Sequence, residues 1–263
     1  MQDVSSTETG TTMDTDSNFA TSAGKQLGLY ALYALFGLSV LIYVLSVAAG
    51  SSGGSVSGGA INVERNSITI VLTEEPPQLD STRSTDAVSF IVLAHAMEGL
   101  IAYDDNDQLT PGVAERWEIR DDGATFWIRE DAKWSDGQPV TAYDFEFAWR
   151  RVLDPATGSE YSFILYPIKN AELVNRGDLP KEMIGVRAVS DRVLEVEFER
   201  PTPYFDKLVA FTTYYPLRED FFGSTNGRYG ADTDMLLSNG PYVVTEWIHG
   251  SSMLWEKNPY YWN

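Results

Sequence analysis

The stretch RWEIRDDGATFWIREDAKWSDGQPVTAYDFEFAWRRVLDP, residues 116–155, decides the fold class because it joins a strand pattern to a helix pattern. Its first part alternates apolar and polar residues on both sides of the Asp-Asp-Gly at 121–123, which predicts a β-hairpin. A capping box of Thr141 with Asp144 then predicts the first turn of a helix, and Pro155 predicts its end. The stretch therefore indicates a mixed α/β protein.

The predicted helix has one apolar face, formed by Phe145, Trp149 and Val152 at helical spacing. Its polar side chains are expected to reach solvent: Asp144, Glu146, Arg150 and Arg151.

Acids among aromatic residues allow two interpretations of this region. A pair of carboxylates facing each other across a cleft is the machinery of a glycoside hydrolase. Alternatively, the acids cap and solvate an ordinary helix, and the tryptophans form a core rather than a platform for sugar. We favour the second interpretation, in which no residue is catalytic. The tryptophans are Trp117, Trp127, Trp134 and Trp149.

The composition excludes several function classes. The formal net charge is -19 with a pI of about 4.3, so the surface repels phosphate backbones and no nucleic acid partner is expected. The chain has no cysteine, which excludes a disulfide framework, a thiolate nucleophile and a cysteine-based metal site. We expect no metal and no cofactor.

The first 60 residues differ from the rest. Residues 1–26 are mostly Ser, Thr, Asp and Gly, and this composition predicts a disordered tail. Leu27–Ala49 carries no charge and is long enough to cross a bilayer, so it predicts a transmembrane anchor or, alternatively, a cleaved signal segment. Residues 50–60 are rich in Gly and Ser and predict a flexible linker.

The sequence of residues 61–263 predicts a mixture of helices and strands and contains no further linker-like segment. Residues 67–72 predict a strand, and Asp86–Leu100 predicts a helix whose inner face includes His95. Residues 185–199 and 242–258 each predict a further hairpin, the second turning near His249.

Asp104 to Asp107 resembles part of a calcium loop but lacks the Gly and the distal Glu of that motif. An ordinary acidic turn is the expectation for this segment. His95 is expected to be a hydrogen-bonded core histidine rather than a metal ligand, since no histidine pair accompanies it.

Several blocks, taken in order, resemble the extracellular solute-binding proteins that deliver oligopeptides and dipeptides to ABC importers. The resemblance runs from about Ile68 to the last residue. Its longest block is the stretch from Met97 to Pro155, and the others are EEPPQLD, PIKNAELVNRG, IGVRAVSDRVLEVEFERPTPYF, YYPLRED, NGPYVVTEW and EKNPYYWN.

The resemblance implies a periplasmic-binding-protein-like lobe with an inserted smaller α+β domain. Residues 61–97 and 219–263 would form the first lobe, still incomplete, and residues 98–218 the inserted domain. The opposing lobe would be absent, so the chain is expected to be a fragment of a longer protein.

The resemblance also implies a function and its partners. The chain would be the substrate-binding component of an ABC importer, capturing oligopeptides and passing them to permease subunits in the cytoplasmic membrane. It would lie in the periplasm or elsewhere outside the cytoplasmic membrane, tethered by or exported through Leu27–Ala49. Other ligands of the family stay open, namely a dipeptide, a nickel chelate, a glycan or haem, as does a membrane-anchored hydrolase.

The resemblance assigns a ligand-binding role to six residues. One contact strand follows the Leu-Asp block and would pair with the peptide backbone, and two aromatic residues match positions that reach the cleft. These residues are Ser84, Thr85, Asp86, Ala87, Tyr161 and Phe211.

Overall fold

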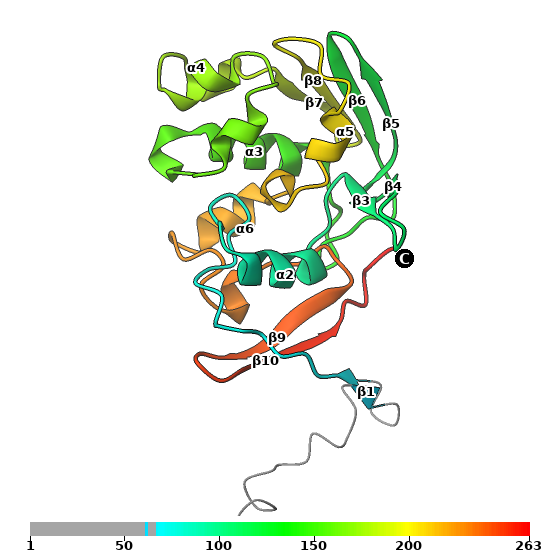
Figure 1. The fold of residues 1–263 in the computed structure, drawn as a ribbon, viewed down its shortest axis with the longest axis vertical. Coiled ribbons are helices and arrows are strands. Elements are labelled where there is room, and N and C mark those ends of the chain that lie inside the picture. The colour runs from blue at the N-terminus through cyan, green and yellow to red at the C-terminus, as the bar shows by residue number, and fades with distance from the viewer. Residues whose placement is uncertain (1–60, 63–66) are drawn as a thin grey trace, which may run out of the picture. The chain divides into compact units, whose positions relative to one another are not determined.

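Four antiparallel strands form the largest sheet, in the order β5-β6-β8-β7 (Figure 1). They are β5 (Ala114–Arg120), β6 (Gly123–Ile128), β7 (Val186–Ser190) and β8 (Val193–Glu197). Two of the three predicted hairpins supply these strands, so both predictions are confirmed. The hairpins meet along β6 and β8, which places two segments far apart in the sequence side by side.

The structure is a computed structural model that describes residues 61–62 and 67–263. It divides into two units, residues 1–71 and 72–263, which are described separately. In the first unit β1 (Ile61–Asn62) pairs antiparallel with β2 (Ser67–Ile68). The predictions for residues 1–26, 27–49 and 50–60 lie outside the described residues. Within the described part, no helix is long and apolar enough to cross a membrane.

The strand predicted over residues 67–72 is wrong beyond Ile68. Residues 69–71 form no strand, and the side chains of Ile70 and Val71 are exposed. A β-branched run forms a strand only where a partner supplies the ladder hydrogen bonds, and Ile61–Asn62 pairs only with the first two residues.

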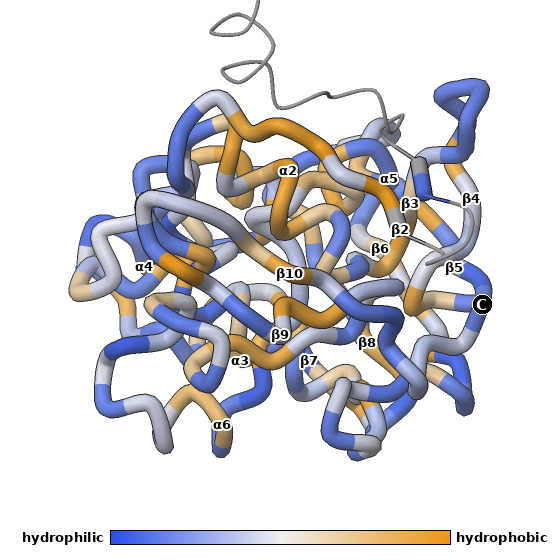
Figure 2. The backbone as a smooth tube through the Cα atoms, turned by 90° about the horizontal axis from the view of Figure 1, so that it is seen from below, coloured by the Kyte–Doolittle hydropathy of each residue, from blue (hydrophilic) through white to orange (hydrophobic). Residues whose placement is uncertain are grey.

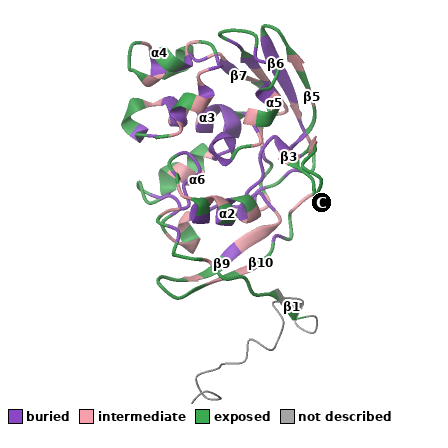
Figure 3. Cartoon of the chain, viewed as in Figure 1, coloured by how far each residue is buried: buried purple, intermediate pink, exposed green. Residues whose placement is uncertain are grey.

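Helix α3 (Ala142–Leu153) packs against β7 and β8 (Figure 1). Figure 3 shows most of this helix as buried, and Phe145 and Trp149 are fully enclosed. The backbone N–H of Thr141 donates to the Asp144 carboxylate at 2.8 Å, as the capping box predicted. The helix ends at Leu153, just before Asp154 and the proline that follows it.

The expectation that Asp144 and Glu146 reach solvent is wrong, because both are buried. The side of α3 expected to face water is covered by β7 and by Trp134. Glu146 accepts a hydrogen bond from the backbone N–H of Ala188 at 3.1 Å and forms an ion pair with Arg150 at 2.6 Å. Burial of these acids is tolerated because protein donors replace water.

The interpretation of the tryptophans as core residues holds for Trp134 and Trp149, which are fully buried. The Trp149 indole donates to the carbonyl of Tyr214 at 2.9 Å. Trp117 and Trp127 are only partly buried, on the sheet. Of these two, Trp117 packs against the hydrophobic core.

The second packing layer of residues 72–263 is α2 (Ala87–Ala96) against the hairpin of β9 (Tyr242–Ile248) and β10 (Ser252–Lys257). This hairpin turns at Gly250, so the third hairpin prediction is confirmed as well. Figure 2 shows hydrophobic residues along much of α2. Ile91, on its outer side, is 44% exposed.

The position of His95 corrects the sequence analysis. The buried face of α2 consists of Val88, Ser89, Val92, Leu93 and Ala96, and His95 lies at its margin, half-buried. Its ring centroid is 5.1 Å from that of Trp255. The helix also ends before Leu100, because Met97 already has extended backbone angles.

The remaining elements are short and connect these two layers. They comprise the hairpin β3 (Ile101–Tyr103) and β4 (Leu109–Pro111), the helices α4 (Ala171–Asn175), α5 (Phe205–Leu208) and α6 (Glu219–Ser224), and the 3₁₀ turns η1 (Pro155–Thr157), η2 (Ser162–Leu165), η3 (Lys181–Met183), η4 (Thr212–Tyr214) and η5 (Thr233–Met235).

Candidate functional site

The segment that precedes α2 is held in place by the buried carboxylate of Asp80. This carboxylate accepts hydrogen bonds from the backbone N–H and the hydroxyl of Thr82, at 3.0 and 2.6 Å. Arg151 of α3 donates to it at 2.6 Å. The backbone carbonyl of Asp80 accepts from the N–H and the hydroxyl of Ser84. These bonds hold the turn before residue 84 in one conformation.

Beyond this turn the backbone offers free polar groups. The N–H groups of Thr85 and Asp86 and the carbonyls of Ser84 and Thr85 form no hydrogen bond within residues 67–263. Thr85 is exposed, and Asp86 has extended angles, φ -102° and ψ 152°. Extended backbone with unpaired donors and acceptors is what an added peptide strand needs in order to pair.

The side chains of this segment have local roles. The hydroxyl of Ser84 is buried and bonded to backbone carbonyls. The Asp86 carboxylate accepts from the N–H of Ser89 at 2.7 Å and caps α2, and Ala87 is the exposed first residue of that helix. The side chains of Ser84 and Asp86 are therefore occupied within the fold, whereas the main-chain groups of this segment and the exposed Thr85 side chain remain available.

The two predicted aromatic residues lie together. The ring centroids of Tyr161 and Phe211 are 5.5 Å apart. Phe90 of α2 joins both, at 5.9 Å from Tyr161 and 5.2 Å from Phe211. Phe163 stacks on Tyr161 at 5.9 Å and is 56% exposed. We call these four residues the aromatic cluster.

Phe90 and Phe163 were missed by the sequence analysis. Phe90 lies one helical turn after Asp86, so it connects the aromatic cluster to the segment with free backbone groups. The spacing of four residues from Asp86 was a usable signal for Phe90. No local pattern in the sequence links Phe163 to this region, because the link runs through a ring contact.

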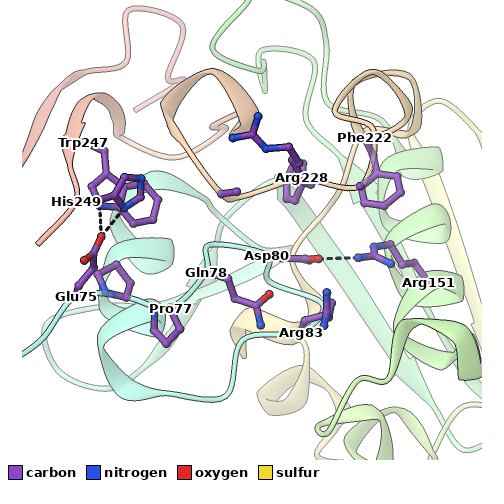
Figure 4. A pocket seen from close by; sticks show the side chains of 14 residues that line it. Glu75, Pro77, Gln78, Asp80, Arg83, Arg151, Phe222, Arg228, Trp247 and His249 are labelled. Atoms are coloured by element: carbon purple, nitrogen blue, oxygen red, sulfur yellow. Dashed lines mark hydrogen bonds and ion pairs between the residues drawn. The ribbon is translucent and has the colours of Figure 1, made fainter.

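A hollow of about 530 Å³ is lined in part by Asp80 and Arg83 of the turn before residue 84 (Figure 4). None of the six residues predicted to bind ligand lines it. Its walls come from the loop around Pro77, from Arg151 and Phe222, and from the turn of the β9-β10 hairpin. It shares Asp80 and Arg83 with the segment before α2, but none of residues 84–87 lines it.

The three acids that would be catalytic candidates in a hydrolase form hydrogen bonds or ion pairs within the protein. Asp136 pairs with Arg218 at 2.6 Å. Asp144 accepts from the Trp134 indole at 3.1 Å, and burial raises the pKa of its carboxyl to about 6. Glu146 is bonded within the fold as described above. These contacts commit all three carboxylates to packing and capping.

Another buried acid, Glu98, bonds to residues near the end of the chain. Its carboxylate accepts from the Tyr261 hydroxyl and the Trp262 indole, each at 2.6 Å. Burial raises the pKa of this carboxyl above its usual value, and the two hydrogen bonds counteract the rise. Glu98 thus joins the start of β3 to the segment after β10.

No group of three or more potential metal ligands lies together among residues 61–62 and 67–263. The acidic stretch at Asp104 is the turn that the sequence indicated. The Asp104 carboxylate accepts from the N–H groups of Asn106 and Gln108, and these bonds lower its pKa.

Known proteins are similar to this chain in sequence. Residues 108–263 match the family described as bacterial extracellular solute-binding proteins, family 5 Middle. The chain is 38% identical over 230 residues to the oligopeptide-binding protein OppA of Bacillus subtilis, covering 85% of this chain and 42% of the relative.

Solved structures give the same result. The substrate-binding domain of an oligopeptide ABC transporter from Bacillus anthracis is similar with a TM-score of 0.72 and 45% identity, over 73% of this chain and 38% of that one. OppA of Listeria monocytogenes bound to peptide is similar with a TM-score of 0.70 and 37% identity, over the same shares.

The chain thus spans less than half the length of these relatives. The family match covers residues 108–263, which is more than half of this chain, and the fold agrees with the solved structures over 73% of it. The chain belongs to the bacterial extracellular solute-binding proteins of family 5.

Proposed function

We propose that this chain is part of the substrate-binding component of an ABC importer that captures oligopeptides outside the cytoplasmic membrane and delivers them to permease subunits. The names of the relatives support the peptide class, since they include an oligopeptide-binding protein and an OppA bound to peptide. The observation that carries the proposal is the unpaired N–H groups of Thr85, which is exposed, and of Asp86, which has extended backbone angles.

In this proposal the peptide lies extended along residues Ser84 to Ala87 and pairs with their main chain. Main-chain pairing does not depend on the side chains of the ligand, so it suits a carrier of varied peptides. Tyr161 and Phe211 then offer aromatic surface to a side chain of the peptide. Phe211 is 36% exposed, so it has area available for contact.

The proposal extends to the domain plan. The first lobe comprises residues 61–97 and 219–263, and the inserted domain comprises residues 98–218. In support, the four-stranded sheet and α3 both fall within 98–218. The contact between α2 and β9 joins the two sequence segments of the first lobe. A second lobe closing over the ligand completes the binding protein in this scheme, by a hinge motion.

Location and tethering are likewise proposed. The family is described as extracellular, and we propose that this chain works in the periplasm or at the outer side of the cytoplasmic membrane. Leu27–Ala49 would tether it or direct its export.

We further propose that the chain binds rather than converts its ligand. The carboxylates of Asp136, Asp144 and Glu146 all engage donors of the fold, which supports a structural role.

Hydrogen exchange tests the proposal directly. The full chain is incubated with trialanine at millimolar concentration, and amide protection is followed by NMR. We expect the N–H groups of Thr85 and Asp86 to gain protection, because they donate to the peptide. Phe211→Ala should weaken this protection, whereas Leu254→Ala, which removes an exposed residue of β10, should not. Protection that appears elsewhere and spares Thr85 and Asp86 contradicts the proposal.

A further inference from the structure

The hollow beside the Asp80 turn combines positive charge with apolar walls (Figure 4). Its volume of about 530 Å³ is in the range of small-molecule sites. Phe222 and Trp247 supply aromatic surface at its two ends. Two prolines of the loop between them, Pro76 and Pro77, add rigid apolar surface.

Both acids of this hollow already have partners within its walls. Glu75 accepts from the Trp247 indole at 3.1 Å and the N–H of Gly250 at 2.7 Å, and its other partner is His249. The bond from His249 is the main cause that lowers the pKa of the Glu75 carboxyl. Asp80 is occupied by Arg151 and Thr82. Neither carboxylate is left to neutralise a further cation.

Two arginines at the hollow have no such partner. The guanidinium groups of Arg83 and Arg228 form no hydrogen bond and no ion pair with any residue of the described part, and both side chains are exposed. In the view of Figure 4 they lie on opposite sides of Asp80. Most other arginines here hold an acid, for example Arg187 with Glu195.

The chain has 38 acidic and 19 basic residues, and in its described part Arg116 and Arg200 likewise form no ion pair. Acids are abundant enough to pair with each arginine, yet the hollow keeps two guanidinium groups free beside the paired Arg151. Guanidinium is a planar donor that matches the two oxygens of a carboxylate or a phosphate.

The wall of the hollow also contains two buried polar atoms. The Tyr229 hydroxyl and the Nε of Arg151 are buried and have no hydrogen-bond partner within residues 67–263. Tyr229 is only 6% exposed, and both residues line the hollow. Both atoms can donate to an oxygen, but because they are buried they lie behind the surface of the wall, next to the unpaired positive charge.

The backbone keeps this wall in place. Gly230 has a φ of +72°, and the N–H of Leu79 donates to its carbonyl at 2.9 Å. A Cβ at Gly230 would lie 2.4 Å from the carbonyl carbon of Leu79. Only glycine allows this approach, which sets the loop of Arg228 and Tyr229 against the loop of Asp80.

We propose that this hollow is a second binding site, for a ligand that carries more than one oxyanion group, and that Arg83 and Arg228 hold those groups. None of residues 84–87 lines this site, although Arg83 directly precedes them in the chain. Two sources share this chemistry: a free small anion and the acidic side chains of a peptide.

Isothermal titration of the full chain tests the site with three probes: citrate, pyrophosphate and acetyl-Glu-Glu-Glu-amide. Each is measured at constant ionic strength set with potassium chloride. We expect at least one probe to bind with a dissociation constant below about 10 mM, a weak but measurable affinity. Binding of citrate or pyrophosphate alone assigns the site to a free anion, and binding of the peptide assigns it to acidic side chains.

The double variant Arg83→Gln with Arg228→Gln should weaken binding at least about tenfold, since two charge-assisted contacts are lost. The matched control is Arg187→Gln with Arg192→Gln, which removes the same charge from β7 and the turn after it. This control should bind as the unchanged chain does. Near-UV circular dichroism verifies that each variant is folded.

Two results would overturn the proposal. One is the absence of binding by all three probes at concentrations up to about 10 mM, which is the weakest dissociation constant expected. The other is an equal loss of affinity in the control, which would show attraction to the general charge of the chain.

Discussion

Arg151 of α3 donates to the buried carboxylate of Asp80 at 2.6 Å and thereby ties the helix of the sheet layer to the turn before α2. The two residues are 71 positions apart in the sequence. Their side chains are 16% and 4% exposed, so the pair is largely shielded from water. The same turn positions the free backbone groups of Thr85 and Asp86.

Asp80→Asn should destabilise the protein strongly. It leaves the guanidinium of Arg151 without its partner in a site with little water, and loss of one member of a buried pair costs about 3–5 kcal/mol. Urea denaturation measures this free energy. The control is Glu195→Gln, because its pair with Arg187 is exposed and such pairs contribute at most about 1 kcal/mol. Equal losses in the free energy of unfolding would show that the Asp80–Arg151 pair contributes no more than an exposed pair.

The buried carboxyl of Asp144 should make stability depend on pH in a definite direction. Burial raises its pKa from 3.8 to about 6, so the folded state binds this proton more tightly than the unfolded state does. The contribution is most favourable below pH 3.8 and is lost as the pH rises through about 6. A shift of about two units corresponds to about 3 kcal/mol.

Urea denaturation between pH 3 and 7, a range of about one unit beyond both pKa values, tests this with Asp144→Asn. The variant lacks the titrating group, so its stability relative to the unchanged chain should improve as the pH rises. Asp131→Asn is the matched control, because Arg129 lowers the pKa of Asp131. Its stability relative to the unchanged chain should fall as the pH rises. The same direction in both variants would contradict the assignment.

Gly123→Ala should disrupt the four-stranded sheet. An added Cβ would lie 2.1 Å from the carbonyl oxygen of Val196 on β8, so the backbone must shift. We expect a loss of more than about 2 kcal/mol, as for other overpacked sites. Gly158→Ala has open space and only the cost of a left-handed conformation, about 1–2 kcal/mol. Thermal and urea unfolding compare the two, and a smaller loss at Gly123 would rule out the close approach.

Peptide binding by residues 61–263 alone should be weaker than micromolar. The candidate segment pairs through one exposed edge, and Thr85 stays open to water on its other side. A peptide that is not enclosed on its other side stays partly hydrated and is therefore bound weakly. Calorimetry with a pool of tripeptides to pentapeptides measures the affinity. Micromolar binding would show that this part of the chain captures peptide without a closing lobe.

Local patterns were sufficient for many elements. The hairpins around residues 121–123 and near Gly250 were predictable because alternation over a few residues and a turn residue determine them. The start of α3 at Thr141 and its end before Pro155 were predictable for the same reason, since caps act within one turn. Size and apolar character predicted burial of all the tryptophans in this region, but only Trp134 and Trp149 are fully buried.

Packing between distant segments was not predictable in this way. Asp144 and Glu146 look like surface residues within α3, but β7 and Trp134 cover them. Residues 69–71 look like a strand, yet no partner in the described part pairs with them. In each case a neighbour from elsewhere in the chain decided the outcome.

What could be predicted of the candidate sites also depended on whether the contacts are local or join distant segments. The sequence by itself determined the mixed α/β class, the three hairpins, the capped helix and, through ordered blocks, the family. Only the tertiary structure decided that Phe90 joins Tyr161 to Phe211, and that Arg83 and Arg228 share one hollow. The physical reason is range: hydrogen bonds of turns and caps connect neighbours in sequence, whereas a site is made by contacts between residues that only folding brings together.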